Sequence, residues 1–474
     1  VVRAGKIWEL YNLRADPTEV NNLAEQMPEK TAELSKMWED WNEECVVIDI
    51  HTGEIMTMAS RPSYDLNDFI PYISTDKFAK LREDPGTPLF ARAFQGGYPP
   101  ASTFKPVVAA TALSNGEVDE WSLIDCPEKI QIGNHWFHNW SKSAEGYIDV
   151  KRAIARSCNP WFYQVGIKTG PSAFLSTARR LGFGAKTGLP LIGETAGLIP
   201  TNEWMKKNHN RNFIDGDTAN LSIGQGVMLA SPLQVAQGMA GIANGSALPK
   251  LRLVRQTQDV SGRVLVSNNP QRRNFINLDS EAVNVVHEGM MQVVHASYGT
   301  GMRAKLSYTV LCGKTGTAQW GPKDKEQRLA WFAGFFPLDN PRYAFAALYE
   351  GKPGERLSGG RKAAPMVSAF FEHFKKDIKK VITPPPRAMV IEEDEDFGDE
   401  GRILDMGNVP RAIPIDEEGE DLLPGEDNAG KLRAIPVEDD EFGPVSPLPP
   451  ALLRPLDPVT PVPPRALPVE DDEE

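Results

Sequence analysis

The pattern of apolar and polar positions changes abruptly near residue 45, and the first stretch typical of a folded sheet begins there. Residues 46–50 are almost continuously apolar, a turn with Gly53 follows, and apolar residues alternate with polar ones in 54–59. Two extended runs joined by a short turn are typical of a β-hairpin. The nearly continuous first run is typical of a strand that helices cover on both faces. We therefore expect two strands of a buried sheet here.

Further along, apolar runs predict more strands, and apolar stretches opened by caps or prolines predict helices. We expect strands at 310–318, 329–336 and 343–349, and helices at 149–156, 161–167, 363–374 and from Ser231 onward. Between residues 116 and 226, helical segments alternate with loops rich in Gly, Pro and Asn. Strands at both ends of a region, with helices inserted between them, predict an α+β fold.

The pattern of a folded domain stops near the end of the chain. From Pro384 onward the chain holds 17 of its 39 prolines, with 25 acidic and 7 basic residues, so this part carries a net charge of −18. The whole chain carries −13, which leaves +5 for the rest. Such a composition buries too little apolar surface to offset its ordering entropy, so we expect residues 381–474 to form a disordered acidic, proline-rich tail.

A degenerate repeat runs through this tail. Each copy joins Arg-Ala to apolar residues and an acidic residue, and the four copies lie at 387–392, 411–416, 433–438 and 465–470. Four weak copies of a linear motif can bind a partner through their effective concentration. A solvated low-complexity tail without a partner is the alternative, and the sequence leaves both open.

Length and composition set outer limits. A chain of 474 residues with 41% hydrophobic residues is expected to form roughly two to four domains. No stretch approaches the roughly 20 apolar residues of a membrane helix, and the start lacks the pattern of a signal peptide. We therefore expect a soluble chain without a targeting signal. The four scattered cysteines, Cys45, Cys126, Cys158 and Cys312, predict neither a disulfide framework nor a zinc ribbon and leave the redox compartment open.

One stretch concentrates the candidate chemistry. It is YPPASTFKP, residues 98–106, directly before the apolar run 107–110. The prolines and the apolar run predict a buried helix whose first turn contains Ser102 and Lys105. Residues three apart share a helix face, so a hydroxyl and an amine lie together where backbone N–H groups point outward. This pair is a serine nucleophile with a lysine base, although an isolated pair is usually an ordinary helix serine beside a snorkelling lysine.

Two later motifs favour the catalytic interpretation. In chain order the three motifs are Ser102-x-x-Lys105 at the helix start, Ser157-x-Asn159 in an interhelical loop, and Lys314-Thr315-Gly316 on a predicted strand. Each is weak alone, but in this order they are the signature of class A β-lactamases and penicillin-binding proteins. The set predicts a serine acyl-transfer site. Gly224 and Gly226 are expected to be structural turns near its floor.

The segments around these motifs resemble one branch of that class. YPPASTFKP, SCNPWFYQVG, LSIGQGVMLASPLQVA, CGKTGTAQ and WFAGFFP are similar to the transpeptidase domain of class B penicillin-binding proteins, most of all the penicillin-binding protein 2 group of cell elongation. The resemblance covers residues 44–380 and implies a five-stranded antiparallel sheet flanked by helices. It also implies a periplasmic or inner-membrane-associated D,D-transpeptidase that cross-links D-Ala-D-Ala stem peptides of peptidoglycan, needs no cofactor and is acylated by β-lactams.

The resemblance also implies a role for each residue of the first two motifs. Ser102 would attack the carbonyl between the two D-alanines, with Lys105 as the base that accepts its proton. Ser157 would relay a proton to the leaving amine, and Asn159 would bind the peptide amide of the donor stem.

The strand motif would bind the end of the substrate. Unless it is buried, Lys314 would carry a charge near one and attract the terminal carboxylate. Thr315 and Thr317, on either side of Gly316, would add hydroxyl donors. The backbone N–H groups of Ser102 and Thr317 would form an oxyanion hole.

A second cluster holds metal-ligand residue types. Cys126, His135 and His138 lie in a short, loop-rich segment, with Asp125 nearby. Some members of the penicillin-binding protein 2 group carry a zinc site after the first motif, and this spacing does not match it securely. The sequence leaves open a structural zinc and, as the alternative, surface histidines beside aromatic residues.

Residues 1–43 have a different resemblance. The stretch WELYNLRADPTEVNNLAEQMPEK is similar to the C-terminal end of bacterial sulfatases, but the sulfatase nucleophile motif is absent, so we expect an inert segment. Class B penicillin-binding proteins normally begin with a membrane helix and a pedestal domain, and here this segment stands in their place. The chain is therefore expected to be a fusion joined near residue 44. Partnership with an elongation complex and its lipid-II polymerising glycosyltransferase would use the replaced parts.

Two alternatives to a transpeptidase stay open. A D,D-carboxypeptidase or β-lactam hydrolase on the same fold would need a residue that activates water, and no E-x-x-L-N motif supplies one. A non-catalytic β-lactam sensor or interaction protein that presents the acidic repeats would not need the serine chemistry. No nucleic-acid partner is expected.

Overall fold

The computed structural model describes residues 2–4, 7–9, 25–29, 44–321 and 326–383. The predicted disorder and repeats of the tail lie outside the described residues, as does most of the sulfatase-like segment. Within that segment, strands β1 (Val2–Ala4) and β2 (Ile7–Glu9) form a short antiparallel pair.

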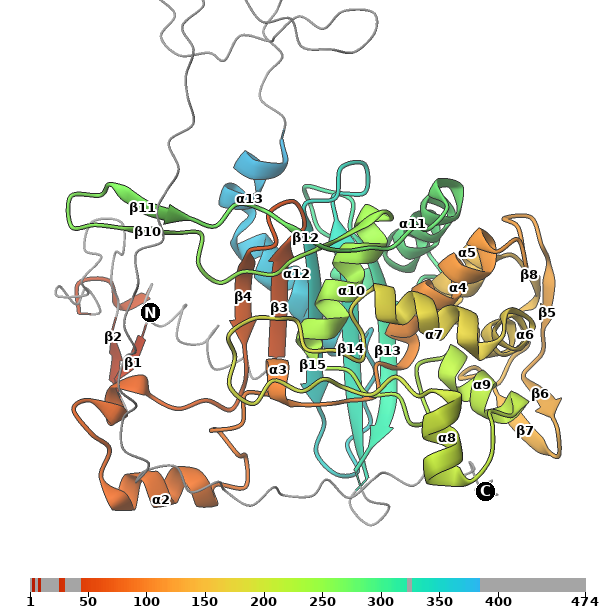
Figure 1. Ribbon diagram of the computed structural model, residues 1–474, viewed down its shortest axis with the longest axis horizontal. Coiled ribbons are helices and arrows are strands. Elements are labelled where there is room, and N and C mark those ends of the chain that lie inside the picture. Colours follow the sequence, from red (N-terminus) through yellow and green to blue (C-terminus); the bar gives the residue numbers. More distant parts are fainter. Residues whose placement is uncertain (1, 5–6, 10–24, 30–43, 322–325, 384–474) are drawn as a thin grey trace, which may run out of the picture. The chain divides into compact units, whose positions relative to one another are not determined.

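A five-stranded antiparallel sheet is the centre of the domain, as predicted (Figure 1). Its strands are β3 (Glu44–Asp49), β4 (Ile55–Ala59), β13 (Cys312–Trp320), β14 (Gln327–Phe336) and β15 (Tyr343–Glu350). They lie in the order β13, β14, β15, β3, β4. The predicted hairpin β3–β4 is confirmed and pairs with β15 through Tyr343 and Asp49, so strands from the two ends of the domain meet inside one sheet. β13, which carries the third motif, forms an edge.

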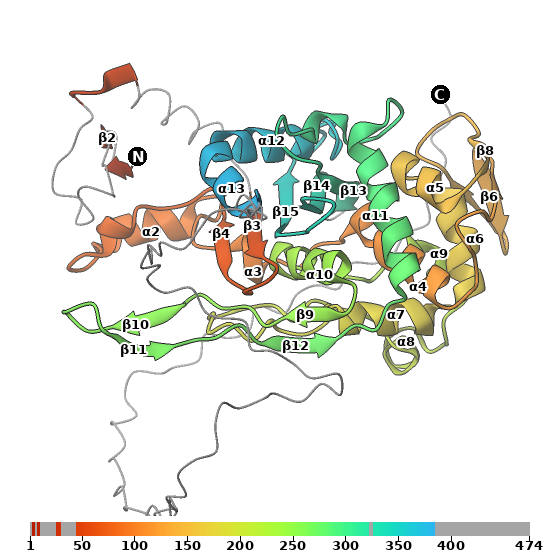
Figure 2. The same ribbon diagram turned by 90° about the horizontal axis from the view of Figure 1, so that it is seen from above.

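Helices cover both faces of this sheet (Figure 2). They are α10 (Pro232–Asn244), α11 (Ser280–His295) and, on the opposite face, α12 (Ala363–His373). Neighbouring residues of β14 point to opposite faces. Phe335 contacts His287 of α11, with ring centroids 4.5 Å apart, and Phe336 contacts Phe371 of α12 at 4.7 Å. Burial of both faces explains the continuous apolar run of this strand.

A helical layer beside the sheet carries the first two motifs. Its helices are η2 (Ala101–Phe104), α4 (Lys105–Ser114), α5 (Val150–Arg156), α6 (Asn159–Thr169), α7 (Pro171–Arg180), α8 (Asn202–His209) and α9 (Asp215–Ser222). Helix starts follow the cap signals. The Asp149 carboxylate accepts from the Arg152 N–H at 2.7 Å, and Ser231 and Gln234 form a capping box at α10. Within the described ranges, no helix is both long enough and apolar enough to cross a bilayer.

The remaining elements are short and lie around this core. They are η1 (Leu66–Phe69), α2 (Thr75–Glu83), α3 (Arg92–Gln95), β5 (Ile124–Cys126), β6 (Lys129–Ile132), β7 (His135–His138), β8 (Gly146–Ile148), β9 (Ala247–Pro249), β10 (Gln256–Gln258), β11 (Val264–Ser267), β12 (Arg272–Phe275), η3 (Met302–Ala304) and α13 (Lys375–Ile382). The pairs β5–β8, β6–β7, β9–β12 and β10–β11 are hairpins or bridges of three or four residues a strand. The sequence does not predict them, because so few residues show no clear period of two.

Candidate active site

Ser102 and Lys105 lie at the start of one buried helical segment, as predicted, but in two kinds of helix. Ser102 belongs to the 3-10 turn η2, and Lys105 is the first residue of α4, whose N–H donates to the Ser102 carbonyl oxygen. The tight turn begins at Ala101, which has a φ of 50°, a left-handed conformation that an alanine rarely adopts. The strained backbone therefore lies directly before the candidate nucleophile.

Gly224 holds that turn in place. The Ala101 N–H donates to the Gly224 carbonyl oxygen at 2.9 Å. Gly224 has a φ of 70°, and a Cβ there would lie 2.1 Å from the Ala101 carbonyl oxygen. Only glycine permits both this backbone angle and this close approach. Gly224 and Gly226 both have a left-handed backbone, as expected for structural turns, but a Cβ on Gly226 would meet no atom closer than 3.6 Å.

The amine of Lys105 is fully buried and bound by the second motif. Nζ lies 2.8 Å from the Ser157 carbonyl oxygen, 3.2 Å from Ser157 Oγ and 2.6 Å from Asn159 Oδ1. It also lies 5.1 Å from the centre of the Phe162 ring. The Ser102 hydroxyl, in contrast, makes no hydrogen bond to another residue in the described part of the chain. The resting site thus orders the base and leaves the nucleophile available to a ligand.

The backbone around the second motif explains how it reaches Lys105. Ser157 ends α5 with a left-handed φ of 56°, which turns its carbonyl and hydroxyl toward the amine. Asn159 was expected in the loop, but it is the first residue of α6. Its N–H donates to Asn139 Oδ1 at 3.1 Å, and its Nδ2 donates to the His138 carbonyl oxygen at 3.3 Å. Its Oδ1 therefore remains the acceptor for Lys105.

Burial also sets the protonation of the base. Desolvation lowers the pKa of Lys105 to about 7, and the nearby Cys158 and Cys126 raise it by a smaller amount. The Ser157 carbonyl and Asn159 Oδ1 can only accept, so together they occupy two N–H groups. A neutral amine then keeps its lone pair for a hydroxyl proton, which is the state that a general base requires.

Lys314 differs from its expected state. It is fully buried, and its Nζ donates to the Thr315 carbonyl oxygen at 3.0 Å. Desolvation, and then the charge of Lys105, lower the pKa of Lys314 well below its usual value. The sequence analysis expected Lys314 to carry a charge near one at neutral pH only if this lysine was not buried. Burial removes that condition, so Lys314 is a weak candidate for a permanently charged carboxylate anchor.

β13 brings the rest of the third motif against η2. A Cβ on Gly316 would lie 3.3 Å from the Ala101 Cβ, so a larger residue would push the strand away from the nucleophile turn. Thr315 Oγ1 lies 2.8 Å from Thr300 Oγ1, and the Gly359 N–H donates to Thr317 Oγ1 at 3.3 Å. Both threonines are therefore fixed by neighbouring loops.

These groups meet in one pocket of about 530 Å³. The motif residues that line it are Ser102, Ser157, Asn159, Thr315, Gly316 and Thr317. Lys105 and Lys314 are fully buried beside it. The pocket also exposes four arginines that no motif indicates, Arg156, Arg303, Arg328 and Arg361. No local signal in the sequence marks them, because single exposed arginines are common and these lie on separate segments.

The predicted metal ligands are not brought together. Cys126 is buried and its thiol is hydrogen-bonded to Cys158, while His135 is exposed at one end of β7 and His138 lies at the other. Residues three apart in a strand point to opposite faces. Across the described ranges, no three His, Cys, Asp or Glu side chains are grouped as a metal site requires. The structure thus gives no support to the zinc hypothesis.

The contact between the two thiols distinguishes them. The hydrogen bond with Cys158 and burial raise the pKa of Cys126, whereas the same hydrogen bond lowers the pKa of Cys158. Cys158 is the middle residue of the second motif, so its buried contact with Cys126 helps to fix the backbone between Ser157 and Asn159.

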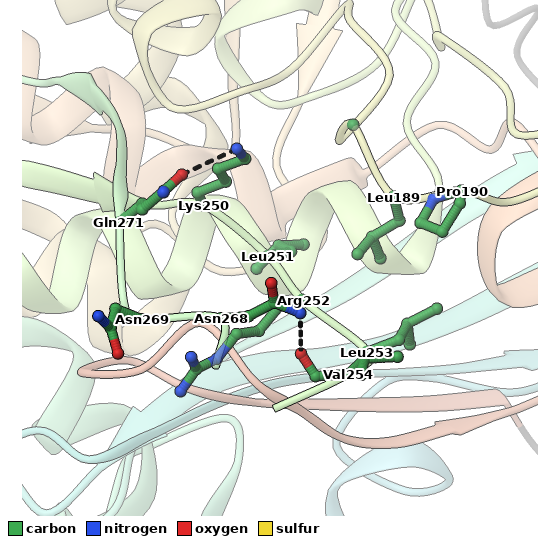
Figure 3. A pocket seen from close by; sticks show the side chains of 11 residues that line it. Leu189, Pro190, Lys250, Leu251, Arg252, Leu253, Val254, Asn268, Asn269 and Gln271 are labelled. Atoms are coloured by element: carbon green, nitrogen blue, oxygen red, sulfur yellow. Dashed lines mark hydrogen bonds between the residues drawn. The ribbon is translucent and has the colours of Figure 1, made fainter. Parts of the chain in front are cut away.

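A second pocket, of about 310 Å³, lies apart from the three motifs (Figure 3). Leu189 and Pro190 line one side, and residues 250–254 line another. Its polar groups bind one another: Lys250 Nζ donates to Gln271 Oε1 at 2.9 Å, and Asn268 Nδ2 donates to the Val254 carbonyl oxygen at 2.8 Å. Because no serine or cysteine lines it, the candidate active site is the larger pocket beside Ser102.

A helix-flanked antiparallel sheet with these three motifs around one pocket defines a class of serine acyl-transfer domains. The family model for the penicillin binding protein transpeptidase domain matches residues 44–372. The chain belongs to the penicillin-binding protein transpeptidase family.

Individual relatives place it closer to one group. The peptidoglycan D,D-transpeptidase MrdA of Haemophilus influenzae is 33% identical over 347 residues, which cover 69% of this chain and 52% of that protein. The crystal structure of Pseudomonas aeruginosa PBP2 in complex with WCK 5153 has a TM-score of 0.64 and 33% identity, covering 73% of each chain. The complex between PBP2 and MreC from Helicobacter pylori has a TM-score of 0.61 and 32% identity, covering 73% of this chain and 63% of that one. The resemblance to the penicillin-binding protein 2 group is confirmed.

The matches do not extend over the whole of those proteins. The chain spans about half the length of the curated relatives that it matches. The sulfatase resemblance of residues 1–43 and the three-part domain division stay predictions.

Proposed function

We propose that this chain is a peptidoglycan D,D-transpeptidase that cross-links stem peptides ending in D-Ala-D-Ala through an acyl-serine intermediate. The observation that carries the proposal is the buried amine of Lys105, with a pKa of about 7, held by Ser157 and Asn159 directly after the Ser102 turn. The Haemophilus influenzae relative is a peptidoglycan D,D-transpeptidase, which supports the same reaction. β-Lactams would acylate the same serine.

In the first half-reaction the peptide bond between the two D-alanines is broken. Ser102 Oγ attacks the carbonyl carbon while its proton passes to the neutral Lys105 amine. As the tetrahedral intermediate collapses, the C–N electron pair leaves with the terminal D-Ala. That amine takes a proton through Ser157 Oγ, which lies 3.2 Å from Lys105 Nζ. The products are an ester on Ser102 and free D-Ala.

In the second half-reaction an amine of another stem peptide attacks the ester carbonyl. The new amide C–N bond forms as the ester C–O bond breaks, the amine proton passes to Lys105, and Ser102 recovers its own proton. The backbone N–H groups of Ser102 and Thr317 would stabilise the oxyanion in both halves, and loss of one such donor typically costs about 3 to 4 kcal/mol of transition-state stabilisation.

Intact-mass spectrometry after incubation with a penicillin tests the proposal. We expect one covalent adduct on the wild type and none on Ser102→Ala. Ser358→Ala is the matched control, because Ser358 lines the same pocket but belongs to none of the three motifs. The absence of an adduct on the wild type, or the presence of one on Ser102→Ala, would contradict the proposal.

The residues that line the pocket also help to distinguish a transpeptidase from the two alternative enzymes. A β-lactam hydrolase or D,D-carboxypeptidase needs a group that activates water for deacylation, and no carboxylate is among the described residues that line this pocket. We therefore expect the penicilloyl adduct to persist for hours. Turnover within seconds would favour a hydrolase. A stable adduct without cross-linked product from stem peptides would favour a sensor.

The same reasoning extends to location and partners. The Helicobacter pylori relative was solved as a complex with MreC. We propose that this chain acts on peptidoglycan outside the cytoplasmic membrane and within an elongation complex. Cross-linking in cells followed by affinity purification tests this, with Ser102→Ala as a folded control. Recovery of no cell-elongation protein with either form would contradict it.

A further inference from the structure

Two buried cysteines meet beside the second motif, and the proposed reaction uses neither thiol. Cys126 is the last residue of β5, and Cys158 is the N-cap residue of α6. Both side chains are fully buried, and their thiols are hydrogen-bonded to each other. Two thiols in contact are the arrangement from which a disulfide bond can form without a large movement of the backbone.

The backbone around the pair is fixed on both sides of Cys126. Nε2 of Gln164, on α6, donates to the carbonyl oxygen of Asp125 at 2.8 Å. The Cys126 carbonyl oxygen accepts from the Glu145 N–H at 2.9 Å, and the Glu145 carboxylate lies 2.6 Å from Nη2 of Arg156, the last residue of α5. These bonds hold β5 against the ends of α5 and α6, where the second motif lies.

The other two cysteines lie too far apart to form a disulfide with each other. Cys45 is on β3 and Cys312 is on β13, and strands β14 and β15 lie between them in the sheet. Neighbouring strands are roughly 5 Å apart, so three spacings separate these cysteines by roughly 14 Å, whereas a disulfide requires Cα atoms within about 7 Å. Cys45 and Cys312 therefore provide an internal control for any oxidation of the chain.

We propose that Cys126 and Cys158 form a disulfide bond that links β5 covalently to the second motif. The oxidant would be another disulfide, either a small molecule or a protein. One cysteine thiolate attacks a sulfur of the oxidant and displaces a thiolate, and the second cysteine then attacks the mixed disulfide and displaces the other. Two electrons and two protons pass to the oxidant, which becomes two thiols, while the two cysteines become one disulfide.

Burial determines when this bond forms. Neither thiol is accessible in the folded chain, so we expect oxidation to occur as the chain folds, and the same burial then protects the bond from reductants. The location proposed above, outside the cytoplasmic membrane, is one in which disulfides persist. The bond would close a loop of about 30 residues and stabilise the fold by restricting the unfolded chain.

Peptide mapping tests whether the bond forms. The full chain is refolded from the reduced, unfolded state in a buffer of oxidised and reduced glutathione, and the full chain exported to the periplasm of a bacterial host provides a second sample. Each is denatured in iodoacetamide, digested and analysed by mass spectrometry. We expect a peptide that contains Cys126 linked to Cys158, with Cys45 and Cys312 alkylated. Alkylation of all four cysteines in both samples, or a different pairing, would overturn the proposal.

The thermal midpoint tests whether the bond stabilises the fold. We expect the oxidised wild type to melt about 5 °C above the reduced wild type. Cys126→Ala should abolish the difference between the two redox states, whereas the matched control Cys45→Ala should keep it. Equal midpoints for the two wild-type forms, or a difference that survives in Cys126→Ala, would contradict the proposal. Neither measurement requires acylation of Ser102, so failure of the disulfide and failure of the proposed function are distinguishable.

Discussion

At the scale of single residues, the site depends on burial of two lysines in one region. Lys105 and Lys314 are both fully buried, and burial lowers the pKa of each, while the charge of Lys105 further lowers the pKa of Lys314. Lys105 has three oxygen contacts from the second motif, whereas Lys314 has one backbone acceptor. The residue with a pKa near neutrality is therefore also the one in contact with a proton relay.

The pH dependence of acylation follows from Lys105. Its pKa is lowered from 10.5 to about 7 by burial, so the amine is charged below this value and neutral above it. Because a base must be neutral, we expect the second-order rate of penicillin acylation to rise from about pH 5.5 and to level off above about pH 8. Stopped-flow measurement with a fluorescent penicillin checks this. A flat profile in protein that stays folded would rule out Lys105 as the titrating base.

The same shift affects stability. Between about pH 7 and pH 10.5 the unfolded chain holds a proton on Lys105 that the folded chain lacks. By linkage, this residue makes folding more favourable as the pH rises through that window, and it disfavours folding below it.

Asn159 allows the pKa of Lys105 to be moved in both directions. Its Oδ1 lies 2.6 Å from Nζ. Asn159→Leu removes an acceptor, which disfavours the ammonium form and should move the midpoint of the acylation profile to lower pH. Asn159→Asp adds a negative charge and should move it to higher pH by about one unit. Shifts of the same sign in both variants would contradict this account.

At the scale of elements, the site depends on how closely η2 approaches the Gly224 turn. Gly224→Ala introduces both a left-handed alanine and a Cβ 2.1 Å from the Ala101 carbonyl oxygen, so we expect a loss of about 2 to 4 kcal/mol in unfolding free energy and much slower acylation. Gly226→Ala has the same kind of backbone angle without the clash and should lose about 1 kcal/mol. Chemical denaturation of both variants provides the comparison. Equal losses would show that the close approach is unimportant.

The elements that the sequence predicts are those with a long, one-sided or continuous pattern. The hairpin β3–β4, the strands β14 and β15 and the helices α10 and α12 are confirmed, because burial repeats over many residues in each. The four short strand pairs have no such repeat. Asn159 was predicted in a loop before a helix at 161–167, but α6 begins at Asn159, because Pro160 is well suited to the first helical turn.

The features of the candidate site also divide into those that the sequence predicts and those that it does not. Ser102, Ser157, Asn159 and the third motif could be predicted, because each motif is local in sequence and their order is informative. Three features depend on distant segments: the burial of Lys314, the contact between Cys126 and Cys158, and the arginines that line the pocket. No sequence pattern within a single segment can therefore predict these features.

At the scale of the whole molecule, charge separates two regions of the chain. From Pro384 onward the sequence carries −18, and the rest carries +5. All residues that line the active-site pocket belong to the positive region. A donor peptide that ends in a carboxylate is attracted by the arginines that line the pocket and repelled by the negative charge of the tail, so the tail should slow the encounter of anionic donors.

Truncation after Thr383 tests this balance. We expect the thermal midpoint to stay within about 2 °C of the full chain, because the described sheet and pocket end before this residue. At low salt, kcat/KM for a donor peptide that ends in a free carboxylate should be severalfold higher in the truncated chain than in the full chain, and the difference should vanish near 0.5 M salt, where the Debye length is about 4 Å. A tail of the same composition in scrambled order is the control. If it behaves like the native tail, charge explains the effect; a difference that depends on the repeats and persists at high salt would contradict an electrostatic role and favour binding by the repeats themselves.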